Sequence, residues 1–303
     1  MSAVSSHLYS DFGAPSGVVL VAEAVTLGMG LVLLLGIGMY VLGSFLLMGR
    51  HVVARQRGAS LREIIRELWT AAWTQPISPF FYLFGRRMAR GKAGGVPIVF
   101  VHGYMQNRVG FLSLARALAR KGLGPMFGFN YPWFVSITSN AERLERFVES
   151  VCRETGSGAV DLVCHSMGGL IAMEMMSNEA RRETLKVRRC VTIATPHAGV
   201  MWRGPLLGIG ATSLRRGSKL LEAHAGVKLA VPCLSVFSSH DNVVHPKESS
   251  SLALRGGRDV EVEGLAHLAI LFSPKVAEHV GAFLAEPDKT PVTATAPAPA
   301  PAE

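Results

Sequence analysis

Short apolar runs rich in β-branched and aromatic residues alternate with helical patterns from residue 97 to residue 285, and this alternation constrains the fold most. The strand-like runs are 97–104, 124–132, 159–164, 187–196, 231–238 and 259–264. The helical patterns are 108–122, 139–156, 166–180 and 273–285. Such alternation predicts an α/β fold, with a mostly parallel sheet of about six strands and helices on both faces.

Two of these helices carry start signals. Ser139 with Glu142 has the spacing of a capping box at the start of the helix 139–156. Ser273 is the predicted N-cap of the last helix, with Pro274 in its first turn. These residues predict where the second and the last helix of the alternating region begin.

A stretch of 26 residues without a formal charge, from Ala24 to Gly49, precedes the alternating region. A transmembrane helix needs about 20 predominantly apolar residues, so the stretch is long enough. A cleaved signal peptide would need a basic start and a small-residue cleavage site, but residues 1–49 contain no Lys or Arg and no A-x-A pattern follows. A buried helix of a soluble protein is the weaker alternative, because such helices rarely run this long without charge. The sequence therefore predicts an N-terminal segment 1–23 and an uncleaved transmembrane anchor at 24–49.

Basic residues flank the predicted anchor on one side only. No Lys or Arg precedes it, and nine follow it before residue 96: Arg50, Arg55, Arg57, Arg62, Arg66, Arg86, Arg87, Arg90 and Lys92. Short flanking segments rich in Lys and Arg stay in the cytoplasm. We therefore expect a single-pass protein of the inner membrane with its C-terminal part in the cytoplasm.

The basic segment 50–95 contains one short amphipathic helical pattern. Ser60 with Glu63 is a capping-box pair at its start. The apolar residues that recur at helical spacing are Leu61, Ile64, Ile65, Leu68, Trp69, Ala72 and Trp73. With arginines on its polar face, this helix fits a membrane surface, and it equally fits packing on the domain that follows. The sequence leaves both alternatives open.

Charge and cysteine usage exclude some classes of protein. The net charge is +9, but much of the excess is in the N-terminal third and no nucleic-acid-binding motif is present. The four cysteines are Cys152, Cys164, Cys190 and Cys233, none of which forms a C-x-x-C pair. Each lies in an apolar stretch, so we interpret them as reduced, buried thiols rather than a disulfide framework or a zinc site.

Ser166 lies where the third strand-like run turns directly into a helix, in the sequence DLVCHSMGGL. Ligands of parallel sheets bind beyond the carboxyl ends of the strands, and such a strand–turn–helix lifts a serine hydroxyl above the sheet. Gly168 is small enough for the close approach of strand and helix at this corner. We therefore predict that Ser166 is a nucleophile.

A serine nucleophile needs a base, and the base needs an acid that orients it. His267, in the loop after the last strand, is the predicted base, and Asp241, just past the preceding strand, is the predicted acid. The order Ser, Asp, His along the chain is the one expected for this topology. The less suitable alternatives are His165, His197, His240, His245 and His279 as bases and Asp259, Glu261 and Glu263 as acids.

Two backbone amides are predicted to stabilise an oxyanion above the nucleophile. The amide of Met167 is at the start of the helix that follows Ser166. The turn after the first strand supplies the second, from Tyr104, which follows Gly103.

Five segments together carry a resemblance to a known superfamily. The segments are PIVFVHGYMQN, VDLVCHSMGG, VTIATPHAG, SSHDNVV and EGLAHLAILFSP. They resemble the α/β-hydrolase superfamily, and closely its bacterial lipases and esterases, over about residues 96–285. Where the motif around the serine usually has glycine, this chain has Cys164.

The resemblance implies a serine hydrolase that cleaves carboxylic esters through an acyl-enzyme, without a metal or an organic cofactor. Residues 198–228 resemble a cap insertion over the acyl site, and the Pro/Ala-rich tail 286–303 is predicted to be disordered. Beside a membrane anchor, a lipid or another membrane-borne ester is the hypothesised substrate.

Two alternatives stay open at this stage. One is an acyltransferase or thioesterase with the same triad, and the other is a non-catalytic, membrane-tethered interaction module. The sequence also leaves the oligomeric state open.

Overall fold

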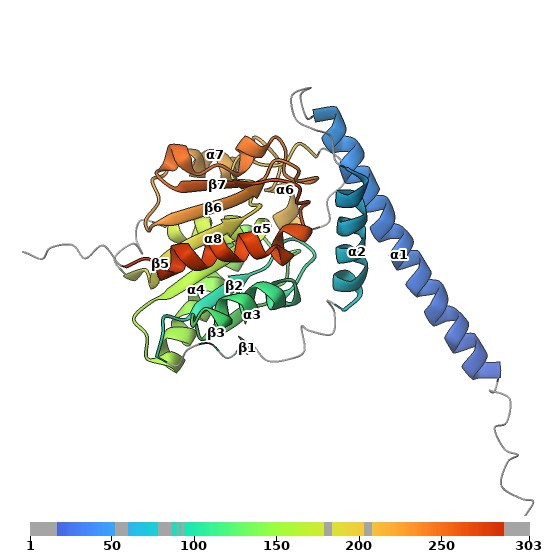
Figure 1. Cartoon of the computed structure of the whole chain (residues 1–303), viewed down its shortest axis with the longest axis horizontal. Helices are drawn as coiled ribbons and strands as arrows, with labels where there is room; N and C mark the ends of the chain where they lie inside the picture. Colours follow the sequence, from blue (N-terminus) through green and yellow to red (C-terminus); the bar gives the residue numbers. More distant parts are fainter. Residues whose placement is uncertain are drawn as a thin grey trace, which may run out of the picture.

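The computed structural model describes residues 17–51, 60–77, 87–89, 91, 94–178, 184–202 and 208–287. Its centre is a seven-stranded sheet in the order β1-β3-β2-β4-β5-β6-β7 (Figure 1). The strands are β1 Arg87–Ala89, β2 Ile98–Val101, β3 Met126–Phe129, β4 Val160–His165, β5 Val187–Ile193, β6 Cys233–Ser238 and β7 Arg258–Val262. Strands β2 to β7 pair in parallel, which confirms the predicted sheet, and the antiparallel edge strand β1 is an addition that the sequence did not predict.

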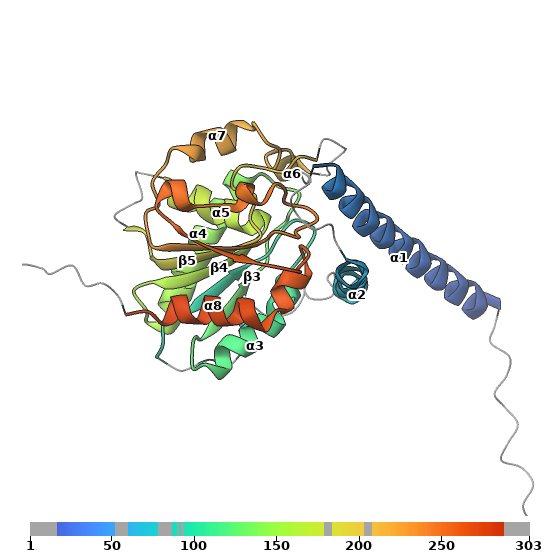
Figure 2. The same ribbon diagram turned by 45° about the horizontal axis from the view of Figure 1, so that its top comes forward.

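Helices cover both faces of the sheet, as predicted. The helices of this domain are α3 Leu112–Arg120, α4 Ile137–Thr155, α5 Met167–Met176, α6 Ile209–Thr212, α7 Lys219–Ala225 and α8 Pro274–Ala285. Short 3₁₀ turns are η2 Arg108–Phe111, η4 Lys247–Ser250, η5 Ala253–Arg255 and η6 Ala269–Phe272. Helices α4 and α5 lie on one face with α7 beyond them, and α3 and α8 lie on the other (Figure 2).

Successive residues of the central strands enter two separate cores. In β2, Val99 and Val101 are buried among α4 and α5, whereas Ile98 and Phe100 are buried among α3 and α8. A strand that is covered on both faces is apolar at nearly every position. The burial of all four residues explains why β2 appears in the sequence as a continuous apolar run.

The start of α4 differs from the prediction. Ser136, not Ser139, is the N-cap: its Oγ accepts a hydrogen bond of 3.1 Å from the backbone N–H of Ser139. The predicted capping box of Ser139 with Glu142 is therefore wrong, because the helix already begins at Ile137, whose side chain is buried. The last helix begins as predicted, with Ser273 at the N-cap and Pro274 in the first turn, although the Ser273 side chain makes no capping hydrogen bond.

The N-terminal helix α1, Gly17–His51, includes the predicted anchor 24–49. Within it, Val19–Gly49 contains an 18-residue stretch with a mean hydropathy of 2.4, and among the described helices it is the one long and apolar enough to cross a membrane. The helix extends well beyond the α/β body (Figures 1 and 2). Only its C-terminal end is packed, where Val41, Phe45 and Met48 form a small core with Ala71 of α2 and Ala266.

The second helix, α2 (Leu61–Ile77), begins with the predicted capping box. The backbone N–H of Ser60 donates to Oε2 of Glu63 at 2.8 Å, and the N–H of Glu63 donates to Oγ of Ser60 at 3.4 Å. The helix lies between α1 and the α/β body (Figures 1 and 2). Packing on the following domain, one of the two alternatives, is thus observed.

The packed face of α2 matches only part of the apolar face that the sequence suggested, since Ile64 and Leu68 pack against the small core shared with α1. Its most buried residues are Glu67, Thr70, Ala71 and Thr74. Leu61, Ile65 and Trp69 are instead 72%, 56% and 72% exposed. These three residues are four apart and form one apolar row on the outer face, so contact with a membrane surface stays a prediction for this row.

Parts of the predicted domain organisation lie outside the described residues. These are residues 1–16 of the N-terminal segment, much of 50–95, residues 203–207 of the insertion and residues 288–303 of the tail. The described part of the insertion contains α6 and α7, which sit against the domain. The ring of His224 in α7 lies 2.7 Å from the Glu174 carboxylate of α5.

Candidate active site

Ser166 occupies a sharp corner between β4 and α5. Strand β4 ends at His165 and the helix begins at Met167, so the chain reverses direction at this one residue. Its backbone has φ 52° and ψ −124°, a conformation that residues other than glycine rarely adopt. A strained serine between a strand and a helix is the geometry that presents a hydroxyl above a parallel sheet.

Glycines around the corner leave room for this approach. A Cβ on Gly168 would collide with the backbone carbonyl oxygens of Val101 and His102, and one on Gly103 would lie 2.9 Å from Cβ of Ser166. Cys164, where the motif usually has glycine, is fully buried, and in the sheet it lies opposite Val101 of β2 and Thr192 of β5. The corner therefore requires glycine at 168 and accommodates the thiol at 164.

We expect Gly168→Ala to lower the free energy of unfolding by about 1–3 kcal/mol, the usual cost of overpacking a tight site. The added methyl group would meet two backbone oxygens, which cannot move without shifting the loop after β2. Urea denaturation in detergent, followed by circular dichroism, measures the change. Gly158→Ala is the matched control, since nothing lies within 4 Å of its Cβ. Equal effects of the two substitutions would contradict the steric argument.

The structure brings Ser166, His267 and Asp241 together in one hydrogen-bonded row. Nε2 of His267 lies 3.0 Å from Oγ of Ser166. On the other side of the ring, Nδ1 lies 2.9 Å and 3.1 Å from the two carboxylate oxygens of Asp241. All three side chains are nearly buried, with exposed fractions of 7%, 5% and 3%.

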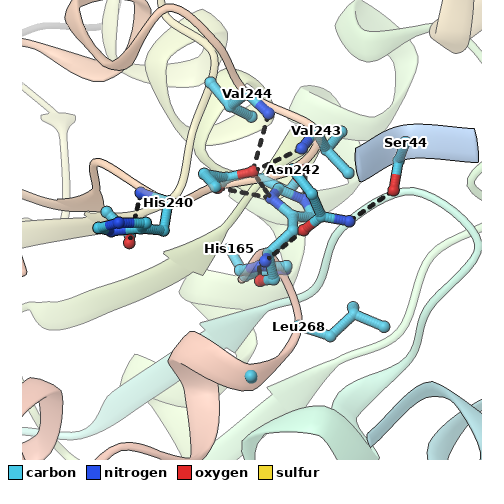
Figure 3. A network of polar contacts seen from close by, with 12 residues as sticks. Ser44, His165, His240, Asn242, Val243, Val244 and Leu268 are labelled. Atoms are coloured by element: carbon cyan, nitrogen blue, oxygen red, sulfur yellow. Dashed lines mark hydrogen bonds and ion pairs between the residues drawn. The ribbon is translucent and has the colours of Figure 1, made fainter. Parts of the chain in front are cut away.

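The carboxylate of Asp241 is itself oriented by the backbone. Its Oδ1 accepts hydrogen bonds of 2.8 Å from the amides of Val243 and Val244, in the turn after β6 (Figure 3). Burial opposes protonation of His267, but the charge of Asp241 and its hydrogen bond outweigh burial and raise the pKa of this ring above its ordinary value. The pair thus stabilises an imidazolium when the ring takes a proton.

His165, next to the predicted nucleophile, contacts two of the loops around the candidate site. Its Nδ1 lies 3.0 Å from Oε1 of Gln106 and its Nε2 lies 3.0 Å from the backbone carbonyl oxygen of His267. Burial lowers the pKa of His165 well below its usual range, so the ring carries one proton and donates to one of these oxygens. Gln106, which the sequence did not single out, also accepts a hydrogen bond from the amide of Gly103.

The alternative bases and acids have other partners. Nδ1 of His240 lies 3.1 Å from the amide of Gly264, and Nε2 of His197 lies 3.1 Å from the hydroxyl of Thr192. His279 is exposed on α8, and His245 is buried beside η4. Asp259 accepts hydrogen bonds from Ser251 and Leu252, and Glu261 pairs with Lys247.

The predicted oxyanion donors lie on the two segments that meet at Ser166. Met167 is the first residue of α5, and the first amides of a helix have no partner within the helix. Tyr104 follows Gly103, whose backbone touches the corner. The loop is held in place by Tyr131, whose hydroxyl donates a hydrogen bond of 2.6 Å to the carbonyl oxygen of His102. The roles of both amides stay predictions.

No metal site is evident in the part of the chain that the structure describes. It contains no group of three or more His, Cys, Asp or Glu side chains that could hold a metal ion. All four cysteines are buried and unpaired, which agrees with the interpretation as reduced thiols.

Sequence reasoning missed three further residues around the loop of His267. Asn242 and Glu67 accept hydrogen bonds from backbone amides of this loop, and Ser44 accepts one from the side chain of Asn242. No sequence signal singled out Glu67, because it is not among the apolar residues of α2 that recur at helical spacing, and only its burial shows that it faces the domain.

Comparisons with known proteins place the fold. A family model described as a domain of unknown function, DUF7379, matches residues 66–202. Among solved structures, a Bacillus licheniformis lipase in its mature form is 15% identical with a TM-score of 0.54, over 66% of this chain and 96% of the lipase. Aspergillus fumigatus lipase B is 16% identical with a TM-score of 0.57, over 65% of this chain and 54% of that chain.

A third similar structure is Est1E from Butyrivibrio proteoclasticus. It is 15% identical with a TM-score of 0.51, over 66% of this chain and 90% of that chain. At such low identity these likenesses establish the fold rather than an activity. The sheet order, the serine corner and these structural neighbours together confirm the resemblance drawn from the sequence: the chain has the α/β-hydrolase fold of bacterial lipases and esterases.

Proposed function

We propose that this protein is a membrane-anchored serine hydrolase that cleaves carboxylic esters through an acyl-enzyme. The observation that carries the proposal is the continuous row of hydrogen bonds from Ser166 through His267 to Asp241. A nucleophile, a base and an orienting acid in this order are what acyl transfer requires. The similar structures named as lipases support ester substrates.

The geometry suggests how each group acts. His267 takes the hydroxyl proton of Ser166 on Nε2 as Oγ attacks the ester carbonyl carbon. The amides of Met167 and Tyr104 donate hydrogen bonds to the oxyanion that forms. His267 then returns the proton to the leaving alcohol, and the acyl group stays on Oγ.

Water completes the reaction by the same route. His267 removes a proton from a water molecule as its oxygen attacks the acyl-enzyme, and then protonates Oγ of Ser166 as the carboxylic acid leaves. Throughout, Asp241 accepts the hydrogen bond from Nδ1–H, keeps Nε2 available as an acceptor and stabilises the imidazolium.

Three features favour a lipid or another membrane-borne ester as substrate. Helix α1 is long and apolar enough to span a bilayer. The outer row of α2 is apolar and exposed. Met105, next to Tyr104, is 48% exposed, and Phe134 and Ile209 are 55% and 71% exposed; the amide of Ile209 donates to the carbonyl oxygen of Phe134, which joins the insertion to the loop after β3. Burying an acyl chain contributes about 0.8 kcal/mol per CH₂.

The charge pattern supports a location for this activity. Basic residues follow the anchor and none precede it within the chain, so the hydrolase domain is proposed to lie on the cytoplasmic side of the inner membrane.

A panel of p-nitrophenyl esters from acetate to palmitate tests the proposed function on the full chain in detergent micelles. We expect hydrolysis, with kcat/KM higher for long, micellar esters than for short, water-soluble ones. Exclusive cleavage of short soluble esters would remove the lipid proposal. A chain that hydrolyses no ester and does not react with a fluorophosphonate would instead be a non-catalytic module.

A further inference from the structure

The loop that carries His267 is fastened to α2 by a buried carboxylate. Oε1 of Glu67 accepts a hydrogen bond of 2.8 Å from the amide of Leu268, and Oε2 accepts one of 2.8 Å from the amide of Ala269. Glu67 is only 1% exposed. Both oxygens of one carboxylate therefore hold the two residues that directly follow the predicted base.

The same loop is also linked to α1. The amide of His267 donates a hydrogen bond of 2.9 Å to Oδ1 of Asn242, the residue next to Asp241. The side-chain amide of Asn242 donates in turn to the hydroxyl of Ser44, at 2.6 Å (Figure 3). Ser44 belongs to α1, so a residue of the N-terminal helix braces the connection between base and acid.

Three successive amides, of residues 267, 268 and 269, thus donate hydrogen bonds to side-chain oxygens. Proton transfer needs the ring nitrogen within hydrogen-bond reach of the serine oxygen, and a misplacement of about 1 Å can cost about 10²-fold in rate. The backbone of this loop decides where the ring of His267 lies, because the histidine side chain has only two rotatable bonds.

We propose that Glu67 and Ser44 are positioning residues for His267, so that both N-terminal helices, the predicted anchor α1 and the packed helix α2, contribute to the active site. The inference rests on the proposed function of the triad. It assigns to α1 and α2 a role in holding the base at hydrogen-bond distance from Ser166.

The charge of Glu67 adds a second effect on the base. Burial raises the pKa of Glu67 to about 7, and the hydrogen bonds from the two loop amides oppose this rise. The ionisable groups that interact with Glu67 are His267, Asp241 and Tyr40 of α1. As a carboxylate, Glu67 helps to raise the pKa of His267.

The substitution Glu67→Gln tests this role in the full chain in detergent. Gln keeps the size of the side chain, but its NH₂ group would face one of the two amide donors, and the negative charge is lost. We expect kcat to fall by up to about 10²-fold with little change in KM. The acid limb of the kcat/KM profile should move to lower pH. The negative charge of Glu67 favours the protonated ring of His267, so its removal lowers the pKa of that ring.

The matched control is Glu63→Gln, one turn earlier on the same helix. It removes an equal charge, and Gln can still act in the capping box with Ser60. Ser44→Ala tests the other helix: it should lower kcat less than Glu67→Gln does, and Ser44→Thr, which keeps the hydroxyl, should restore it. If Glu67 only capped η6, the substitution Glu67→Gln would lower the melting temperature but leave the acid limb of the kcat/KM profile in place.

Hydrogen exchange gives a readout that does not depend on hydrolysis. Exchange of the amides of Leu268 and Ala269, measured by mass spectrometry, should be faster in Glu67→Gln than in the wild type and unchanged in Glu63→Gln. Unchanged exchange, or wild-type kcat and acid limb in both Glu67→Gln and Ser44→Ala, would overturn the inference. A wild type that is inert to esters and to a fluorophosphonate, yet shows the exchange difference, would overturn the proposed function while leaving the loop contacts supported.

Discussion

The substitution Ser166→Ala is expected to lower kcat for ester hydrolysis by about 10⁶-fold, the size of the loss when a triad nucleophile is removed. Alanine leaves the corner between β4 and α5 without an oxygen that can attack the carbonyl carbon. A residual acceleration of about 10³-fold over water should persist, since the oxyanion donors and the binding surface stay in place. Single-turnover hydrolysis measures the loss, and labelling by a fluorophosphonate should disappear with it.

Ser177→Ala is the control for this substitution. Ser177 lies at the C-terminal end of the same helix, where its hydroxyl donates to the carbonyl oxygen of Met173. The control should keep both activity and labelling. Persistent labelling of Ser166→Ala would mean that another residue is the nucleophile.

The substitution Asp241→Asn is expected to lower kcat by about 10⁴-fold with the fold intact. The amides of Val243 and Val244 already donate to Oδ1 at this position, so an Asn side chain would keep its oxygen there and turn its NH₂ toward His267. Nδ1 of the ring would then accept rather than donate, and the proton would move to Nε2, which faces Ser166. In this tautomer the ring cannot take the hydroxyl proton. Steady-state hydrolysis near neutral pH measures the effect.

Asp259→Asn provides the comparison for this second prediction. Asp259 is a carboxylate on the neighbouring strand β7, where it accepts hydrogen bonds from Ser251 and Leu252. Its substitution should change kcat little, even if it lowers stability. A loss as large as that of Asp241→Asn would show that the acid had been assigned to the wrong strand.

Much of the domain was predictable because local patterns decide it. Strands β2, β4 and β6 are buried at every position, so each appears as a mainly apolar run that stands out from its neighbours. Strand β1 escaped prediction because three residues at an antiparallel edge carry no such signal. The N-cap of α4 was misplaced because Ser136 and Ser139 both suit a helix start, and only the burial of Ile137 distinguishes them.

In the candidate site, too, some residues were predictable from the sequence and others were not. Ser166, Asp241 and His267 were predictable from chain order, because in a parallel sheet the carboxyl ends of successive strands meet at one edge. Glu67 and Ser44 were not, since each contacts a loop about 200 residues later in the chain. No local pattern encodes which face of α2 meets that loop.

By itself, the sequence determined the α/β architecture, the apolar N-terminal helix and the candidates for a nucleophile, a base and an acid, because periodicity and strand order are local properties of the chain. Only the tertiary structure decided that α2 turns Glu67 inward and Leu61 and Trp69 outward, and that α1 reaches Asn242 through Ser44. The physical reason is that a buried carboxylate is tolerated where two backbone amides satisfy it, and those amides come from the far end of the chain.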